Sequence, residues 1–395
     1  MTPAALLSVV AGVWWLCSVA VLLVSFAAAL AHPVRRRRTT KSGDFPGVSA
    51  IVPIKHLHAD FERALRSLFT QDYAGLEVLI SAQEARSPAV EGAERVRHAF
   101  PGVPSQILQS RLKGAASPKL NTLWPALCEA GNDLILTKDS NLRLEPGELE
   151  CLVRELSPGT GLVSTIAIAR EPRSFAAWIE VAILNNYHAR ILMLADAAGL
   201  GFGLGKIMLF RRSDLMRVGG FECLAWALGE DMALAGALER LGLRTVLARC
   251  VSRQTLGARS FSEIWQRQLR WMIVWRIQMP AAFIGDFLGS AGPTAVAGAA
   301  AATLFGVSPW LVATSTLAGW FILESLLCAL KGWPLALLSL PAFVAREILT
   351  PVLWLRACTT REVIWAGTMQ RAGSRPPKSR FTSAPVAPVA GRADQ

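Results

Sequence analysis

The start of the chain constrains the fold more than any other feature, because the 28 residues from Ala4 to Ala31 carry no charge. A helix needs about 20 apolar residues to cross the hydrocarbon of a bilayer, so this run is long enough. A cleaved signal peptide is the alternative, since Ala29-Leu30-Ala31 looks like a cleavage site. However, no basic residue precedes the run, and it exceeds the roughly 7–15 apolar residues of a signal sequence. We therefore expect an uncleaved transmembrane anchor over residues 1–32.

Positive charge follows the anchor directly, with Arg35 to Arg38 and then Lys41. The chain has a net charge of +12, and a basic balance is one sign of nucleic-acid binding. Because the arginines adjoin an apolar span, contact with anionic lipid explains them better, and we expect no nucleic-acid partner. Residues 33–46 are predicted as a basic juxtamembrane linker. By the positive-inside rule the domain that follows is cytoplasmic, and we expect it at the inner membrane of a bacterium.

Apolar residues gather a second time in a C-terminal region, residues 281–357. Trp310–Leu330 and Trp333–Leu355 each have the length and composition of a transmembrane span, whereas Gly292–Val307 is a weaker candidate, either re-entrant or interfacial. The tail, residues 358–395, is basic and rich in Pro, Ala and Ser, which predicts a largely disordered, cytoplasmic segment. A cytoplasmic tail requires an even number of C-terminal spans, yet composition leaves two or three open. The chain is thus predicted to be a multi-pass membrane protein.

Between the apolar ends, residues 47–280 have the composition of a globular domain. Short apolar runs typical of buried strands alternate there with segments of helical periodicity. Such alternation predicts an α/β fold with a mostly parallel, Rossmann-type sheet, whose ligands bind at the carboxyl ends of the strands. The predicted strands are 49–54, 76–81 and 133–137, and the predicted helices are 61–69, 90–100 and 119–130.

Polar residues follow two of these strands. Glu84 comes soon after the second strand, and Asp139, Ser140 and Asn141 come directly after the third. A lone Asp-Ser-Asn is more often a turn than a metal site. Its place at a strand end nevertheless makes it a candidate for ligand binding.

Two helices carry further candidates. Glu230-Asp231 opens a helix, where an acidic pair is ordinarily explained by capping and the helix dipole. Arg267, Arg270 and Trp271 lie at positions i, i+3 and i+4 of another helix and therefore share one face. Arginines on a surface helix beside a membrane are the ordinary explanation for that face. Taken singly, neither pattern identifies a function.

In order along the chain, these motifs resemble the Asp, Asp, Asp, (Gln/Arg)-x-x-Arg-Trp signature of processive and lipid-directed family 2-type glycosyltransferases. The resemblance is closer to the ceramide glucosyltransferases, a family 21-type group, and it extends over about residues 10 to 370. As an ordered set the motifs are specific, although each alone is weak. Further segments that carry the resemblance are Phe45–Ser49, Gln71-Asp72-Tyr73, Ser117–Leu123, His188 and Arg276–Pro280.

The resemblance implies a GT-A-like nucleotide-sugar-binding domain that uses a UDP-sugar, most of all UDP-glucose. The acceptor implied is a membrane lipid, ceramide before others, and the reaction is an inverting transfer. In that family's pattern Asp231 is the general base and Glu84 lies near the uridine. Asp139 and Asn141 would hold Mg²⁺ or Mn²⁺, whose preferred ligands are hard oxygens.

The remaining motif residues are assigned by the same resemblance. Arg267 and Arg270, with Lys119, would bind the diphosphate, and Trp271 and His188 would line the acceptor site. Two positions depart from the family's pattern. The first acidic residue is Glu84 rather than Asp, and Asn141, a neutral ligand, stands where metal-binding relatives often have Asp. The neutral ligand predicts weaker binding of a divalent cation.

Other functions remain open at this stage. A transferase acting on hopanoid or another lipid shares the same motifs. A processive polysaccharide synthase needs more spans than this chain offers. From a different class, a non-catalytic membrane scaffold is disfavoured because packing alone requires neither Asp231 nor the Arg-x-x-Arg-Trp helix.

Overall fold

The computed structural model describes residues 2–32, 45–58, 60–365 and 368–371. The predicted linker arginines, Arg35 to Arg38, and most of the basic tail lie outside these residues. The chain divides into two compact units, which we call the sheet unit and the helical unit. The sheet unit comprises residues 33–167, 199–255 and 365–395, and the helical unit comprises residues 1–32, 168–198 and 256–364. The predicted domain boundary at residue 280 stays a prediction.

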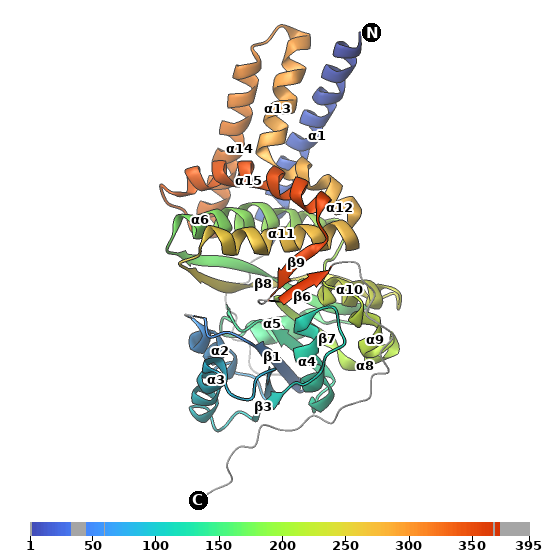
Figure 1. Cartoon of the computed structure of the whole chain (residues 1–395), viewed down its shortest axis with the longest axis vertical. Helices are drawn as coiled ribbons and strands as arrows, with labels where there is room; N and C mark the ends of the chain where they lie inside the picture. The colour runs from blue at the N-terminus through green and yellow to red at the C-terminus, as the bar shows by residue number, and fades with distance from the viewer. Residues whose placement is uncertain (1, 33–44, 59, 366–367, 372–395) are drawn as a thin grey trace, which may run out of the picture. The chain divides into compact units, whose positions relative to one another are not determined.

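An eight-stranded mixed sheet forms the sheet unit, with strand order β3-β2-β1-β4-β7-β6-β8-β5 (Figure 1). β1 is parallel to β2 and β4, its two neighbours, and β3 is parallel to β2. β7 pairs antiparallel with β4 and β6, and β5 pairs antiparallel with β8. The predicted α/β sheet is thus confirmed, with an antiparallel half beside the parallel one. The strands are β1 (Val48–Ile54), β2 (Leu76–Ala82), β3 (Ser105–Gln109), β4 (Leu134–Lys138), β5 (Leu142–Arg143), β6 (Thr160–Pro172), β7 (Ile207–Arg211) and β8 (Arg244–Gly257).

Helices cover both faces of the parallel strands. Alternate residues of a strand point to opposite faces, so β1 contributes to two cores. Val48 and Val52 pack in one core with residues of α2 and α3, and Ile51 packs in the other with residues of α4. Strands buried on both faces read as continuous apolar runs, which is why these were predictable. The helices of this unit are α2 (Phe61–Phe69), α3 (Pro88–His98), α4 (Pro118–Glu129), α5 (Glu148–Glu155), α8 (Arg212–Arg217), α9 (Gly220–Ala225) and α10 (Glu230–Glu239).

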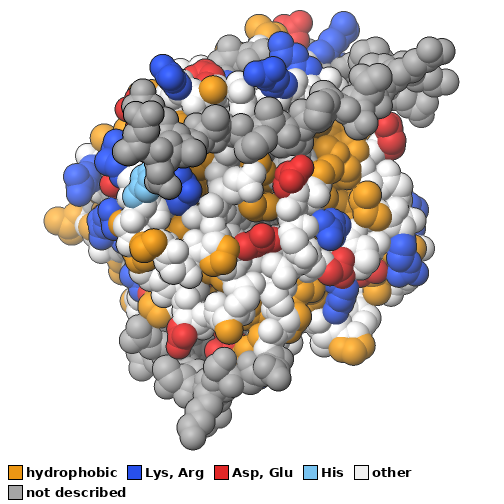
Figure 2. All heavy atoms as spheres, turned by 90° about the horizontal axis from the view of Figure 1, so that it is seen from below, with side chains coloured by type: hydrophobic (Ala, Val, Ile, Leu, Met, Phe, Trp, Pro, Cys, Tyr) orange, Lys and Arg blue, Asp and Glu red, His pale blue; other side chains and the backbone are white. Residues whose placement is uncertain are grey.

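In the view of Figure 2, Lys and Arg side chains are interspersed with Asp and Glu side chains and with apolar ones. Mixed charge of this kind is usual for a surface in contact with water. The face in that view therefore differs in character from the apolar helices described next.

Three helices of the helical unit, α1, α13 and α14, pack side by side (Figure 1). The indole N–H of Trp15 on α1 donates a hydrogen bond to Thr316 Oγ1 of α14 at 3.0 Å, and Gly298 of α13 lies against the same indole ring. The elements of this unit are α1 (Pro3–Ala31), α6 (Phe175–Val181), the π-helical segment η1 (Ala182–Ala189), α7 (Arg190–Ala197), α11 (Phe261–Gln278), α12 (Pro280–Gly285), η2 (Asp286–Gly289), α13 (Ala291–Ala302), η3 (Thr303–Phe305), α14 (Pro309–Lys331) and α15 (Ser339–Thr359). A short hairpin, β9 (Glu362–Trp365) and β10 (Thr368–Arg371), ends the described chain.

Two of the described helices are long and apolar enough to cross a membrane, α1 with 29 residues and α14 with 23. The predicted anchor and the predicted span Trp310–Leu330 are therefore confirmed by length and composition. The segments Pro280–Gly289 and Ala291–Phe305 pass the same test only together, with a bend of 66° between them. That geometry fits a broken span or a re-entrant loop, as expected for Gly292–Val307.

The predicted span Trp333–Leu355 is wrong. Its residues form α15 from Ser339 onward, and this helix is not among the described helices apolar enough to cross. α15 contains Arg346 and Glu347, and it runs across the direction of α1, α13 and α14 (Figure 1). Figure 1 also shows α13 and α14 running in opposite directions, so an even number of crossings can be made by this pair instead.

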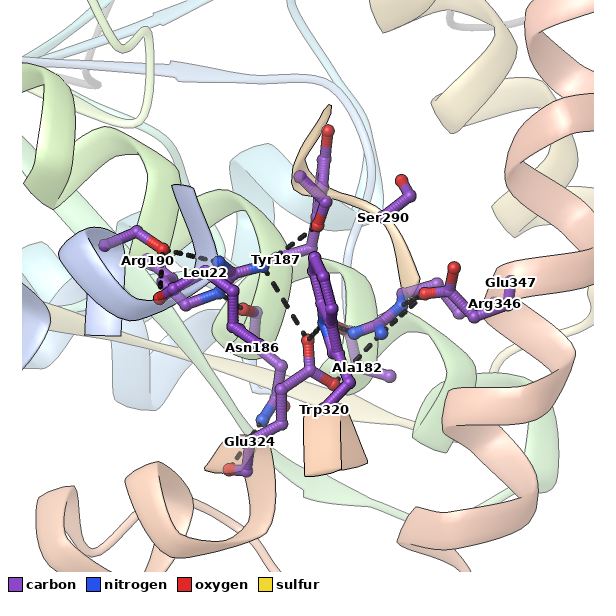
Figure 3. Close-up of polar contacts among 12 residues, drawn as sticks. Leu22, Ala182, Asn186, Tyr187, Arg190, Ser290, Trp320, Glu324, Arg346 and Glu347 are labelled. Carbon is purple, nitrogen blue, oxygen red and sulfur yellow. Dashed lines mark hydrogen bonds and ion pairs between the residues drawn. The ribbon is translucent and has the colours of Figure 1, made fainter. Parts of the chain in front are cut away.

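A buried polar network fixes α14 within the helical unit (Figure 3). Glu324 of α14 lies between two arginines, with Arg346 Nη2 at 3.0 Å from Oε2 and Arg190 Nη2 at 3.9 Å from Oε1. The indole N–H of Trp320 donates to Oε1 at 3.2 Å. Charged side chains on membrane helices face protein and pair with one another, because an uncompensated charge in hydrocarbon is costly.

Replacing Gly298 by alanine tests the packing of the three-helix bundle. A Cβ atom there would lie 2.6 Å from Trp15 Cδ1 and 3.0 Å from Val312 Cγ1, so the helices must move apart. Overpacking of this kind typically costs about 1–3 kcal/mol, and we expect a lower Tm for the purified protein in detergent. Gly319→Ala on α14 is the matched control, because its Cβ would meet nothing within 4 Å. Equal Tm values for the two variants would contradict this packing.

Candidate functional site

The carboxyl ends of β1, β2 and β4 open into a cavity of about 210 Å³ in the sheet unit. This is the edge at which ligands bind in open α/β sheets. The side chains that follow the three strands, together with the first turn of α4, form its walls. The lining residues are Pro53, Ile54, Lys55, His56, His58, Gln83, Pro118, Lys119, Thr122, Asp139, Ser140, Asn141 and Trp365.

Lys119 is the central cation of this site. Ser117 caps α4 by accepting a hydrogen bond from Leu120 N, which sets the first turn that carries Lys119. The Lys119 ammonium lies 2.7 Å from Asp139 Oδ1 and 3.7 Å from Glu230 Oε1, and it donates to the Gly205 carbonyl. Burial works to lower the pKa of Lys119, but the surrounding carboxylates outweigh burial and raise the pKa above its ordinary value. Lys119 is therefore charged at neutral pH.

Asp231 is held by backbone donors at the start of α10. Gly205 N donates to Oδ2 at 2.6 Å, and Met232 N donates to Oδ1 at 2.9 Å. A Cβ atom on Gly205 would lie 2.8 Å from Oδ2, and one on Gly203 would lie 2.1 Å from the Asp231 carbonyl oxygen. The close contact of the Gly203–Gly205 backbone with Asp231 thus requires glycine at both positions. Burial raises the pKa of the Asp231 carboxyl, and the nearby Lys119 charge offsets part of the rise.

Glu230 is buried beside Asp231 and accepts a hydrogen bond from Ser117 Oγ at 2.7 Å. Burial raises its pKa as well, against the opposing effect of Lys119. The two carboxyls that open α10 therefore differ in role. Glu230 joins α10 to the start of α4, whereas Asp231 is half-buried and lies against the glycine-rich segment Gly201–Gly205.

Asp139 and Asn141, the predicted metal ligands, both line the cavity. Asn141 Oδ1 is buried and has no hydrogen-bond partner among the described residues, and the Asp139 carboxylate already lies against a cation, the Lys119 ammonium. A carboxylate and a free amide oxygen suit a Mg²⁺-like ion that takes its other ligands from substrate phosphates and water. Among the described residues no group of three or more His, Cys, Asp or Glu side chains could hold a metal by itself.

Glu84, the predicted uridine ligand, is exposed, and it is the adjacent Gln83 that lines the cavity. Lys55, His56 and His58 also line it and were not predicted. Their signal was available, because they directly follow the first predicted strand and so lie at its carboxyl end.

The other predicted residues lie in the helical unit, on α11 and η1. Arg267 pairs with the fully buried Glu180 of α6, and Arg259 Nε lies 3.9 Å from the other oxygen of that carboxylate. The His188 ring lies 5.6 Å from the Trp271 ring and 5.1 Å from the Trp275 ring. The structure therefore brings His188 and Trp271 together. Sequence reasoning missed Glu180 and Trp275.

Comparison with known proteins identifies the family. The sequence model of Glycosyl transferase family 21 matches residues 13–376. The chain belongs to this family. It is therefore a member of a glycosyltransferase family, as predicted, and the resemblance found from its motifs is confirmed.

Two curated relatives of this family 21 chain are ceramide glucosyltransferases. Ceramide glucosyltransferase 1 of Caenorhabditis elegans is 26% identical over 237 residues, which are 60% of this chain and 51% of that protein. Ceramide glucosyltransferase of Komagataella phaffii is 26% identical over 271 residues, 60% of this chain and 53% of that protein. The chain thus spans about half the length of the curated relatives it matches.

Among solved structures, a mannosyltransferase from Pyrobaculum calidifontis in complex with GDP-Man and Mn²⁺ is similar in fold. The TM-score is 0.54 at 19% identity, and the match covers 87% of this chain and 99% of that one. The similarity supports the GT-A-type fold predicted for the family 21 chain.

Replacing Lys119 by methionine tests the electrostatic balance of the site. Methionine retains an apolar stem but leaves three carboxylates without their shared cation. Removing one partner of a buried ion pair typically costs about 3–5 kcal/mol, so we expect a clearly lower Tm. Without the ammonium the pKa values of Glu230 and Asp231 rise further, so the folded state takes up protons more readily than the unfolded state. The difference in Tm between Lys119→Met and the unmodified protein should therefore become smaller as the pH is lowered from about 8 to about 5.

Lys113→Met is the control for that variant, since Lys113 is exposed on the preceding loop. Its Tm should match that of the unmodified protein throughout the same pH series. A Lys119→Met deficit that stays constant with pH would contradict the proposed role of the carboxylates.

Proposed function

We propose that this family 21 glycosyltransferase transfers glucose from UDP-glucose to a hydroxyl of ceramide, with inversion at the anomeric carbon. The observation that carries the proposal is the convergence of Asp139, Glu230 and Asp231 on the Lys119 ammonium. This convergence supports the assignment of a donor-binding carboxylate and a general base to one site, at the edge where α/β sheets bind ligands. The names of the two curated relatives support the choice of sugar and acceptor.

The donor part of the proposal rests on the cavity in the sheet unit. Lys119 is charged and lies at the cavity wall, where it can bind diphosphate oxygens through charge-assisted hydrogen bonds. Asp139 and the free Oδ1 of Asn141 would hold Mg²⁺ or Mn²⁺, which would neutralise the leaving diphosphate. Uridine recognition is assigned to Glu84, beside the cavity-lining Gln83.

Asp231 is proposed as the general base that accepts the proton of the acceptor hydroxyl. Burial raises the pKa of this carboxyl, and a base becomes more effective as its pKa approaches the working pH. The backbone donors Gly205 N and Met232 N fix its orientation, which fixes the direction from which the hydroxyl is activated. As Asp231 takes the proton, the acceptor oxygen bonds to one face of the anomeric carbon and the bond to the diphosphate breaks on the opposite face, which gives inversion in one displacement.

Arg267 and Arg270 are proposed to bind the diphosphate, and Trp271 and His188 to line the acceptor site. The buried Glu180 carboxylate fixes Arg267, so that its guanidinium is oriented before any ligand binds. His188 packs against Trp271 in a tilted arrangement and against Trp275 edge to face, which offers a largely apolar wall suited to a lipid.

The proposal places the sheet unit in the cytoplasm of a bacterium, with the enzyme in the inner membrane. Arg35 to Arg38 follow the first span, and the cytoplasmic side attracts such clusters. A reporter fused near residue 150 should therefore show cytoplasmic activity, measured with paired phosphatase and fluorescent-protein fusions. Phosphatase activity at that position would place the domain on the periplasmic side of the membrane and contradict the proposed topology.

Asp231→Asn tests the base. General-base help contributes about 10²–10⁴-fold, so we expect glucosylceramide formation to fall by that factor while UDP binding is retained. Asparagine keeps the size and one acceptor oxygen but cannot take up the proton. Both quantities are measured on one preparation, with labelled UDP-glucose and ceramide for transfer and calorimetry for UDP.

The unmodified enzyme provides the reference for donor and acceptor. It should transfer sugar to ceramide from UDP-glucose in preference to GDP-sugars. A hopanoid product in place of glucosylceramide would show that the acceptor is hopanoid and not ceramide. If Asp231→Asn retains more than about a tenth of the unmodified rate, Asp231 is not the base, and Glu230→Gln becomes the variant to measure.

A further inference from the structure

One face of α15 is apolar and uncovered. Leu340, Val344, Ile348, Val352 and Leu355 are all exposed, with Ile348 at 67%. Their spacing of three and four residues places them in a single stripe along the whole helix. Isolated exposed apolar residues are normal on proteins, but a continuous stripe of large aliphatic side chains marks a contact surface.

The opposite face of α15 is packed and hydrogen-bonded within the helical unit. Arg346 donates to the Ala182 carbonyl of η1 at 3.1 Å and pairs with Glu324 of α14 (Figure 3). Trp354 Nε1 donates to the Phe283 carbonyl at 3.0 Å. At the end of the helix, Arg276 of α11 donates to the Cys358 and Thr360 carbonyls at 2.6 and 2.8 Å. α15 is therefore a fixed part of the unit, and its stripe faces away from it.

The direction of α15 and its place in the chain indicate what covers the stripe. α15 runs across the direction of α1, α13 and α14 (Figure 1), and it begins soon after α14, which ends at Lys331. The connection between them includes Leu337, which is 97% exposed. The apolar surface is thus continuous with a helix that is long and apolar enough to cross a membrane.

We propose that α15 lies in the plane of the membrane, with the stripe from Leu340 to Leu355 in the boundary between headgroups and acyl chains. Helices of this kind bury one apolar face about 5–10 Å into that boundary. Most such helices turn a charged face to water, whereas α15 turns its second face to protein, where Arg346 is compensated by Glu324 and Glu347. The partner is the lipid bilayer itself.

The placement of α15 has a consequence that depends on the proposed function. Through Arg276 and Arg346 the helix is bonded to α11 and η1, which carry Trp271 and His188. A helix held at a fixed depth therefore fixes the depth of these aromatic rings. We infer that α15 positions the acceptor site at the level of a lipid headgroup.

Depth measurements on nitroxide labels test the orientation without any activity assay. Cysteine replaces Leu340, Ile348 or Leu355 in the full chain, after the exposed Cys17, Cys128 and Cys358 are changed to serine. The protein is reconstituted in vesicles of phosphatidylcholine and phosphatidylglycerol. Collisions of each label with oxygen and with a water-soluble nickel chelate then give its depth.

The expected result is one shallow depth for all three labels. A label at Leu16, exposed on α1, serves as the deep reference, and one at His98, exposed on α3, serves as the aqueous reference. A helix that crosses the membrane would instead separate Leu340 and Leu355 by about 22 Å along the normal. That gradient, or labels open to the chelate, or labels shielded from both reagents by a protein partner, would each overturn the proposal.

The effect on the acceptor is tested with Val344→Glu/Ile348→Glu. We expect a severalfold higher KM for ceramide in vesicles, an unchanged KM for UDP-glucose and an unchanged Tm in detergent. Thr359→Glu, at an exposed polar position of the same helix, is the matched control. Equal KM values for ceramide in the two variants would remove the positioning role. If the unmodified enzyme forms no glycolipid, the proposed function fails, while the depth result still decides the orientation of α15.

Discussion

The site in the sheet unit depends on one ammonium group. Lys119 joins the first turn of α4, the end of β4 and the start of α10, which are far apart in the sequence. Without it the carboxylates of Asp139, Glu230 and Asp231 would lose a shared compensating charge, and like charges at short range repel strongly where water is scarce. The same charge that stabilises this arrangement also suits the site to an anionic ligand, so stability and binding share a single group.

Much of this arrangement could be predicted from the sequence. Asp139 was predictable because it follows a clear strand end, and Asp231 because an acidic pair opens a helix, whereas Lys119 was identified only through the family resemblance. Glu84 shows the limit, since it is exposed while its neighbour Gln83 faces the cavity. After a strand ends, no regular period tells which of two adjacent side chains turns inward. Glu180 was not predictable either, because a single acid in an apolar helix shows nothing of the arginine it meets.

The prediction of one membrane span failed for a related reason. Trp333–Leu355 was predicted to cross from its length and its many apolar residues, but α15, which forms there, is not among the described helices apolar enough to cross. In the structure the exposed large aliphatic residues of α15 lie on one face, while Arg346 and Glu347 lie on the packed side with the buried Leu349 and Leu353. The Glu324 carboxylate that compensates Arg346 belongs to another helix. The charge of Arg346 on α15 is therefore compensated by a residue of α14, which a sequence window centred on α15 does not include.

The π-helical segment Ala182–Ala189 makes the pairing of α7 with α14 sensitive to the number of residues in the chain. Two of its backbone carbonyls accept hydrogen bonds from arginine side chains: Arg346 donates to the Ala182 carbonyl and Arg190 donates to the Asn186 carbonyl. A wide turn of this kind holds one residue more than an α-helical turn of the same length. Deletion of one residue here would rotate everything beyond it by about 100°. The Arg190 side chain, buried against Glu324, would then turn away, so the pairing of α7 with α14 depends on the number of residues in this segment.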